Sequence, residues 1–243
     1  MKVYTALQIG EYHLNNCEDY LTVNKIGQDK LLCAVMDGCT MGIDSHFIAT
    51  LVGKIIRKIA KEKSYKELYG LENPIDLDSY LKSILLNLFT ELNLIRKQLS
   101  LNKEELLTTL ILLLLDKKEN AGIVLTIGDG LVSINGELFE YDHDNKPDYL
   151  GFHLNEDFEK WYDSLKQKKL FNKIEDISIT TDGIFMFSPI KKVDDEIADP
   201  IKFLLKDTSE SDSEDMLNRK LKKLEHVFGL KPTDDLAVVR IIK

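Results

Sequence analysis

The sequence is poor in cysteine, and its cysteines are not spaced as a metal or redox motif requires. Only three of its 243 residues are cysteines, Cys17, Cys33 and Cys39, and no two of them form a C-x-x-C pair. A disulfide framework and a zinc knuckle are therefore not expected, and a reducing cytoplasm is the simplest setting for the chain.

Basic charge and long apolar segments are also scarce. The 32 Lys and Arg residues are outnumbered by 41 Asp and Glu residues, and the resulting net charge of −9 argues against a nucleic-acid partner, which would need a basic surface. The longest apolar run, near Leu106–Leu115, is far shorter than the ~20 residues of a membrane helix. The N-terminus lacks the apolar segment of a signal peptide. We therefore expect a cytoplasmic protein without a membrane partner.

The sequence does contain a series of apolar segments with two different periods. Alternating or continuous apolar residues predict strands, apolar residues three and four apart predict helices, and Asn135-Gly136 predicts a type I′ hairpin turn. The predicted strands cover residues 3–9, 20–26, 31–36, 106–115, 122–127, 131–134, 137–141, 174–181 and 236–242, and the predicted helices cover residues 43–59, 78–99, 193–205 and 215–228. The stretch 142–172 is less regular, and it is either a mobile flap or partner-binding insert, or a covered loop with a short helix.

Carboxylates recur where the predicted strands begin or end. They are Glu18-Asp19, Asp37-Gly38, Asp129, Asp182-Gly183 and Asp234-Asp235. A carboxylate at the end of a buried strand is costly unless a positive partner meets it, and antiparallel pairing of strands 20–26 and 31–36 would bring Asp19 and Asp37 together. One such turn is typical of a simple cap, but five without a neighbouring basic residue indicate a cation site. Hard oxygen ligands without His or Cys favour Mg²⁺ or Mn²⁺ over zinc.

The order of these motifs resembles that of the metal-dependent protein phosphatases, the phosphatase-2C-like family. The matching segments, each followed by the family pattern, are Asn16-Cys17-Glu18-Asp19 (N-x-E-D), Val35-Met36-Asp37-Gly38 (V-x-D-G), Thr108-Thr109-Leu110 (S-T-hydrophobic), Ile127-Gly128-Asp129-Gly130 (G-D), Thr181-Asp182-Gly183-Ile184 (S-D-G-hydrophobic) and Thr233–Val239 (D-N-hydrophobic-T-V-V). Each motif is short, but the six occur in the same order along almost the whole chain.

The resemblance implies both a fold and an activity. The implied fold is α+β, a four-layer α/β/β/α sandwich of two antiparallel sheets flanked by helices, and it forms a single domain over residues 1–243 with the flap or insert at about 142–172. The implied activity is that of a serine/threonine protein phosphatase, which hydrolyses phosphoprotein monoesters with a hydroxide that bridges two Mn²⁺ or Mg²⁺ ions. The expected partners are a phosphorylated protein substrate and a separately encoded kinase or sensor.

The resemblance also implies roles for individual residues. The implied metal ligands are Glu18, Asp37, Gly38 through its carbonyl, Asp182, Asp234 and, through bound water, Asp19. Asp37 would bridge the two ions, and Asp129 would join Asp182 at an optional third ion. The implied catalytic residues are Asp37, Asp19 and His13.

Two departures from the family pattern concern the phosphate. Leu14 occupies the position at which many members carry a phosphate-binding Arg, and Cys39-Thr40-Met41-Gly42 lacks the usual His. The segment Gly10-Glu11-Tyr12-His13 resembles instead a bacterial branch with a G-x-x-H segment. We assign His13 to phosphate binding or proton delivery, and a structural hydrogen bond that closes loop 10–16 is an equal alternative.

Other hydrolase classes do not fit the sequence. Val35 stands where a haloacid-dehalogenase-type phosphatase needs its first Asp, no cysteine begins a C-x5-R motif, and G-x-S-x-G is absent. The remaining alternative is a catalytically weak phosphatase-like protein that binds a partner or senses a ligand through the same fold. The missing Arg favours this alternative, and the retained carboxylates oppose it.

Overall fold

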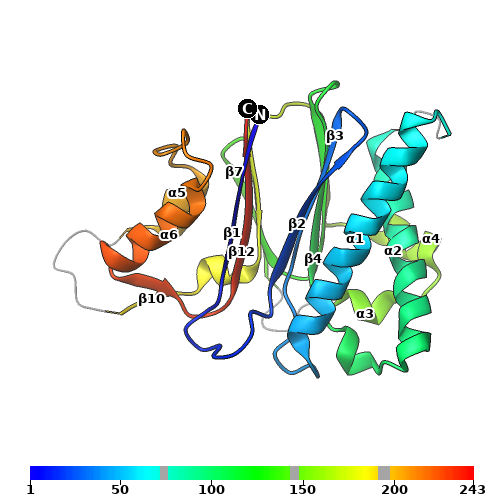
Figure 1. The fold of residues 1–243 in the computed structure, drawn as a ribbon, viewed down its shortest axis with the longest axis horizontal. Coiled ribbons are helices and arrows are strands. Elements are labelled where there is room, and N and C mark those ends of the chain that lie inside the picture. The colour runs from blue at the N-terminus through cyan, green and yellow to red at the C-terminus, as the bar shows by residue number, and fades with distance from the viewer. Residues whose placement is uncertain (72–75, 143–147, 191–197) are drawn as a thin grey trace.

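Two five-stranded antiparallel sheets form the centre of the molecule (Figure 1). The computed structural model describes residues 1–71, 76–142, 148–190 and 198–243. The first sheet has the order β1 (Lys2–Gln8), β12 (Leu236–Ile242), β9 (Asp176–Thr180), β6 (Gly130–Ile134) and β7 (Glu137–Tyr141). The second has the order β2 (Tyr20–Ile26), β3 (Lys30–Met36), β4 (Leu110–Asp116), β5 (Ala121–Ile127) and β8 (Lys168–Phe171). The short strands β10 (Phe187–Pro189) and β11 (Leu230–Pro232) pair separately.

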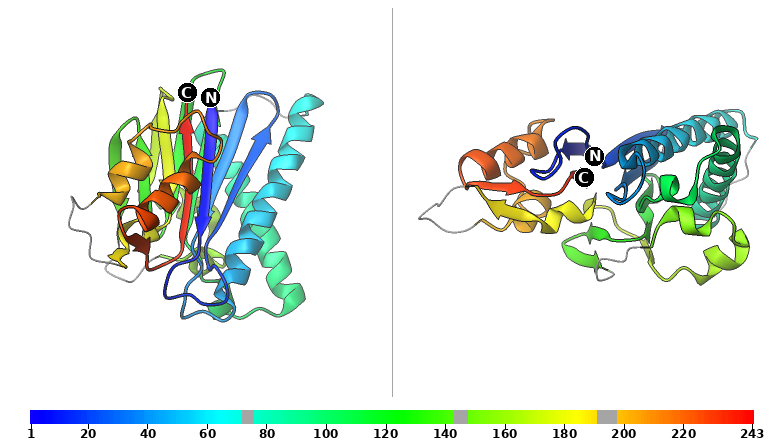
Figure 2. Two further views of the ribbon diagram at one scale, coloured as in Figure 1. Left: turned by 60° about the vertical axis from the view of Figure 1, so that its left-hand side comes forward. Right: turned by 90° about the horizontal axis from the view of Figure 1, so that it is seen from below.

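Helices cover the outer face of each sheet, as Figure 2 shows from the side and from below. The second sheet is covered by α1 (Ser45–Leu68), α2 (Leu77–Leu99), α3 (Leu150–His153) and α4 (Phe158–Ser164), and the first by α5 (Pro200–Leu205) and α6 (Met216–His226). Two 3-10 turns, η1 (Lys103–Leu106) and η2 (Asp182–Phe185), connect helices and strands. The predicted α/β/β/α sandwich is confirmed. None of the described helices is long and apolar enough to cross a membrane.

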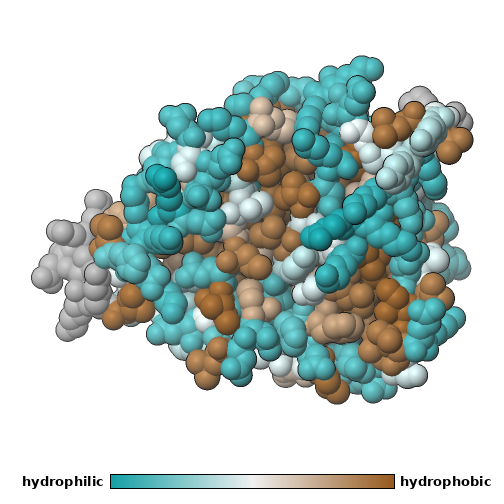
Figure 3. Space-filling view, viewed as in Figure 1, coloured by the Kyte–Doolittle hydropathy of each residue, from teal (hydrophilic) through white to brown (hydrophobic). Residues whose placement is uncertain are grey.

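The central strand β3 shows why this arrangement produces continuous apolar runs. Successive side chains of a strand point to opposite faces, and both faces of β3 are covered. Leu32, Ala34 and Met36 pack in the core beneath α1 and α2, whereas Leu31, Cys33 and Val35 pack in the core between the two sheets. A third core lies between the first sheet and α6. Figure 3 shows apolar side chains at the open edge between β1 and β2, where the inner core reaches the surface.

The strand register brings the acidic turns to one end of the sandwich. Tyr20 pairs with Met36 across β2 and β3. Asp19 directly precedes Tyr20 and Asp37 directly follows Met36, so the two aspartates lie at the same end of this strand pair. Val238 pairs with Thr180, which places the start of β12 beside the end of β9. Because β1 ends opposite the start of β12, loop 10–19 crosses the same end of the molecule.

Most predicted elements are present, with some differences at their ends. Asn135 and Gly136 have φ values of 51° and 91°, which confirms the type I′ turn because both of its central residues need positive φ. The helix predicted to end at residue 59 continues as α1 to Leu68, and the strand predicted from residue 106 begins only at Leu110, because η1 comes first. The short strands β8, β10 and β11 were not predicted, since segments of three or four residues carry too little pattern.

Two predicted regions are partly outside the described residues. Residues 143–147 of the stretch 142–172 are not described, and the described remainder forms α3, α4 and β8, with Trp161 and Tyr162 buried beneath α2. The predicted helix 193–205 is described only from residue 198, and within that part α5 begins at Pro200.

Candidate active site

The end of β3 fixes the backbone of Asp37. Its carbonyl oxygen accepts hydrogen bonds from the Thr109 N–H at 2.8 Å and from the Thr108 hydroxyl at 2.8 Å, and its own N–H donates to the Thr109 hydroxyl at 3.1 Å. The polar backbone of Asp37 is therefore satisfied by the Thr-Thr pair that precedes β4, and its carboxylate remains available at the end of the sandwich.

Glycines in the acidic turns allow neighbouring loops to touch. The Gly38 N–H donates to the Glu18 carbonyl at 3.2 Å, and a Cβ at this position would overlap the Ser45 carbonyl oxygen. A Cβ on Gly183 would likewise overlap the Asp235 carbonyl oxygen. The Asp-Gly sequence thus allows close backbone packing, at Gly38 against the loop before β2 and the start of α1, and at Gly183 against the turn before β12.

The carboxylates at this end of the sandwich interact electrostatically. Burial first, and then the charges of Asp19, Asp182 and Asp234, raise the pKa of Asp37 well above its usual value. Burial and the charges of Asp182, Asp235 and Asp234 likewise raise the pKa of Asp19, although the Thr181 hydrogen bond opposes the rise. Burial raises the pKa of Asp182 to about 7, with contributions from Asp234 and Asp129. Each shift has the same two causes, namely burial first and then the negative charge of neighbouring carboxylates.

Hydroxyl groups hold two of these carboxylates in place. The Thr181 hydroxyl donates to Asp19 Oδ2 at 2.6 Å and accepts a hydrogen bond from the Ala237 N–H at 2.9 Å, so it links β2 to the end of β9 and to β12. The Ser45 hydroxyl donates to Glu18 Oε1, which ties the same loop to the start of α1.

Asp235 holds loop 10–18 over the site. Its side chain is only 1% exposed, and its two oxygens accept hydrogen bonds from the backbone N–H groups of Gly10 and Glu18. Its Oδ2 also lies 2.9 Å from His13 Nδ1, although that contact lacks hydrogen-bond alignment. Sequence reasoning placed Asp235 in an acidic turn but gave it no role, because the crossing of this loop over β12 is visible only in the fold.

His13 lies among carboxylates rather than in an open basic recess. Its side chain is 16% exposed and lies 3.7 Å from Asp234 and 3.9 Å from Glu18, in addition to Asp235. Burial lowers the pKa of His13, but these three carboxylates outweigh burial, so that the pKa is raised overall. The surrounding carboxylates therefore favour the protonated form of the ring.

Asp129 reaches the site from the side of β6 and β7. It lies in a small cavity of about 170 Å³ that Asp182 also lines, together with Glu140, Tyr141, Asp142, Phe185 and Met186. Its charge contributes to the raised pKa of Asp182. The structure thus places Asp129 near Asp182 and at the margin of the Asp19–Asp37 pair.

The donor set suits divalent cations. Buried Glu18 Oε2 has no hydrogen-bond partner among the described residues, and neighbouring carboxylates add to the effect of burial in raising the pKa values of Asp37 and Asp19. Oxygen donors with excess negative charge are the ligands of Mg²⁺ and Mn²⁺. In the described ranges no group of three or more His, Cys, Asp or Glu side chains is arranged so that it could hold an ion.

Sequence reasoning found the carboxylates but not the groups that orient them. Thr181, Ser45 and Asp235 each hold a carboxylate or its loop through one hydrogen bond or more. Thr181 directly precedes Asp182, so a hydroxyl side chain next to an acidic turn was the sequence feature that could have indicated its role. No comparable signal marks Ser45, whose role depends on the position of α1.

The two-sheet sandwich with its acidic end is that of a phosphatase-2C-like protein. A family model described as Protein phosphatase 2C matches residues 9–224, so the chain belongs to the protein phosphatase 2C family. The resemblance inferred from the six motifs is thereby confirmed, and the chain is a protein phosphatase by family. No curated protein matches the chain.

Solved structures show the same fold at low sequence identity. A bacterial serine phosphatase is similar with a TM-score of 0.63 and 15% identity, over 99% of this chain and 96% of that chain. The serine/threonine phosphatase Stp1 from Staphylococcus aureus gives a TM-score of 0.60 at 15% identity, over 100% and 95% of the two chains. RsbX in complex with magnesium gives 0.54 at 16% identity, over 98% and 92%.

Proposed function

We propose that this chain is a Mn²⁺- or Mg²⁺-dependent serine/threonine phosphatase acting on phosphoproteins. The observation that supports this most directly is the group of buried and half-buried carboxylates, Asp19, Asp37, Asp182 and Asp234, in which burial and neighbouring negative charge both disfavour the ionised form unless a cation is bound. Membership of the protein phosphatase 2C family supports the same reaction. A similar structure is described as a magnesium complex, which supports the choice of ion.

The proposed ligands follow the motifs of the sequence. Two ions would be held by Glu18, Asp37, the Gly38 carbonyl, Asp182 and Asp234, with Asp19 binding through water, and a third by Asp129 and Asp182. Bound divalent cations neutralise phosphoryl oxygens and lower the pKa of water until it is a nucleophile near neutral pH. Asp19, oriented by Thr181, would accept a hydrogen bond from that water.

His13 retains its two proposed roles. The contact between His13 and Asp235 supports closure of loop 10–16, whereas its place among the proposed ligands supports phosphate binding or proton delivery.

A cysteine nucleophile is not proposed. Burial raises the pKa of the Cys17 thiol and raises that of Cys33 to about 12, so neither is a ready thiolate. Direct attack of water, without a phosphoenzyme, is therefore the proposed route.

The biological setting is proposed on the same basis. We propose that residues 1–243 form one catalytic domain with the 142–172 region as its insert. We further propose that this domain works in the cytoplasm on a phosphorylated protein, alongside a separately encoded kinase or sensor.

The test is phosphatase activity on an aryl phosphate and on phosphoserine and phosphothreonine peptides. We expect turnover with Mn²⁺ that disappears in chelator and returns when Mn²⁺ is added in excess. Calorimetry would measure metal binding separately. Chelator-resistant turnover or a trapped phosphoenzyme would contradict the mechanism, and tight metal binding without turnover of any phosphopeptide would support the partner-binding alternative.

A further inference from the structure

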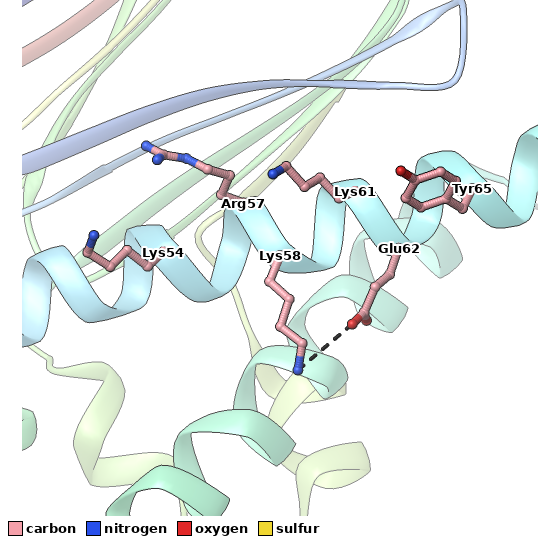
Figure 4. A pocket seen from close by; sticks show the side chains of 6 residues that line it. All are labelled: Lys54, Arg57, Lys58, Lys61, Glu62 and Tyr65. Atoms are coloured by element: carbon pink, nitrogen blue, oxygen red, sulfur yellow. Dashed lines mark ion pairs between the residues drawn. The ribbon is translucent and has the colours of Figure 1, made fainter.

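A basic groove on α1 stands out in an acidic protein. It is a hollow of about 380 Å³ lined by Lys54, Arg57, Lys58, Lys61, Glu62 and Tyr65, and all six side chains are exposed (Figure 4). Four of them are cations, whereas the whole chain has a net charge of −9. The groove is thus a local reversal of the sign of the surface charge.

The cations of the groove are only partly neutralised within the chain. Lys58 lies 2.7 Å from Glu91 and 3.8 Å from Glu62, and Figure 4 shows it on the side of α1 that faces α2. Arg57 contacts only the Tyr20 hydroxyl at 3.2 Å among the described residues.

Lys54 and Lys61 have no ion-pair partner in the described part of the chain, and Figure 4 shows them directed, with Arg57, toward the strands. One side of the groove is therefore purely basic.

The spacing of these cations is unfavourable for the helix itself. Lys54 and Lys58 are four residues apart, as are Arg57 and Lys61, and like charges at this spacing repel. A helix whose exposed face only needed to be soluble would gain from alternating signs. The repulsion is relieved when an external anionic group lies between the cations.

We propose that the basic groove binds an acidic, extended segment of a partner protein. From Lys54 to Tyr65 the helix extends roughly 16 Å, which matches about five residues of extended chain. Asp or Glu side chains of such a segment would pair with Lys54, Arg57 and Lys61, while the ring of Tyr65, 63% exposed, offers apolar contact.

The test uses a fluorescein-labelled peptide of twelve Glu and Asp residues and the full-length protein, with fluorescence anisotropy as the readout. We expect saturable binding at low salt that weakens as salt is added, and no binding of a Gln/Asn peptide of equal length. The variant Lys54→Glu/Lys61→Glu should bind about tenfold more weakly, because two uncompensated cations become anions. Circular dichroism would establish that the variant is folded.

The matched control is Lys118→Glu/Lys222→Glu, which changes the charge equally at two other exposed lysines. It should retain the binding of the unmodified protein. The proposal is overturned if the acidic peptide does not bind, or if the two double variants bind it equally. It is also overturned if vesicles containing phosphatidylserine, but not the peptide, bind in a manner that depends on Lys54 and Lys61. None of these outcomes depends on phosphatase activity.

Discussion

Two buried charged regions of this molecule are built in opposite ways. At the candidate active site, Asp19, Asp37, Asp182 and Asp234 lie close together beside His13, and the pKa values of the four carboxylates are raised. Between the first sheet and α6, by contrast, buried cations meet carboxylates and carbonyl oxygens. We call this second group, Asp176, Asp207, Lys220 and Arg240, the structural charge cluster.

In the structural charge cluster each buried cation has several partners. Arg240 donates to both Asp176 oxygens at 3.0 and 2.7 Å, to the Leu204 carbonyl at 2.8 Å and to the Asp207 carbonyl at 2.7 Å. Lys220 donates to the Phe203 carbonyl at 2.9 Å and to Asp207 Oδ1 at 2.7 Å. The hydrogen bonds from Lys220 and Ser209 lower the pKa of Asp207 to about 2.

The difference separates charge that serves stability from charge that serves binding. A buried ion pair with all hydrogen bonds made is costly to break, whereas a group of like charges lowers stability until a counter-ion arrives. Substitutions should therefore have opposite effects in the two regions, and four experiments test that contrast.

The largest effect is expected from Asp37→Asn. Removing the proposed bridging carboxylate should lower kcat/KM by about 10³-fold, equivalent to ~4 kcal/mol of lost transition-state stabilisation. It should also raise the melting temperature of the metal-free protein, because one repelling charge is gone. Calorimetry with Mn²⁺, phosphatase assays and thermal melts would measure this.

The control for this experiment is Asp44→Asn, an isosteric change at an exposed residue without a side-chain cap hydrogen bond. Its left-handed backbone, with φ at 53°, suits Asn as well as Asp. Unchanged Mn²⁺ affinity in Asp37→Asn would remove Asp37 from the proposed ligands.

Arg240→Met should act on stability alone. It leaves the half-buried Asp176 and the buried Leu204 carbonyl without their donor, while the Asp207 carbonyl keeps its hydrogen bond from Lys220, so we expect a loss of about 3 kcal/mol in the free energy of unfolding. Urea unfolding would measure the loss, with exposed Arg219→Met on α6 as the control. If the two Arg variants were equally stable, the structural charge cluster would not support the fold as described.

Asp235→Asn should have an intermediate effect on function. The N–H groups of Gly10 and Glu18 donate to different oxygens of Asp235, and in Asn one of those oxygens is replaced by an NH2 donor, so one of the two hydrogen bonds is lost. Misplacement of Glu18 should weaken Mn²⁺ affinity or activity by about 10- to 100-fold, as for other groups that orient metal ligands. Equal Mn²⁺ titrations for Asp235→Asn and the unmodified protein would contradict this positioning role.

The smallest effect concerns acid stability. The folded-state pKa of Asp207 lies below its ordinary value of 3.8. Its contribution to the free energy of unfolding is therefore complete above about pH 4 and is lost as the pH falls toward 2. Burial lowers the pKa of Lys220 more than Asp207 raises it, and the Asp207 side chain is 40% exposed. Allowing for solvent screening, we expect the ionised Asp207 to contribute about 1 kcal/mol to the free energy of unfolding.

Asp207→Asn should flatten this part of the pH profile of unfolding. A profile with the same slope between pH 4 and 2 in both proteins would show that other carboxylates carry it. Asp212→Asn, in the same acidic loop but fully exposed, is the control.

The sequence predicted that carboxylates gather at the strand ends, but it did not predict the structural charge cluster. Carboxylates at strand ends can be recognised because the period of apolar residues locates each end, as for Asp37 after β3. Arg240 lies within the apolar run of β12 and Lys220 within α6, and nothing in either pattern shows which carboxylate they meet. Their partners lie 64 and 13 residues away, so the pairing depends on the fold.

β3 is buried on both of its faces, and this affects how the candidate active site can move. A strand that packs into two cores at once should exchange its amide hydrogens only when the whole molecule unfolds. Asp37 is attached to that strand, whereas Glu18 and His13 belong to a loop fastened by Asp235, Ser45 and the Gly38 N–H. Hydrogen exchange should therefore show slow exchange for the half of the site on β3 and faster exchange, by local opening, for the half on loop 10–18. Opening of this loop would let ions enter and leave the site without unfolding of the sandwich.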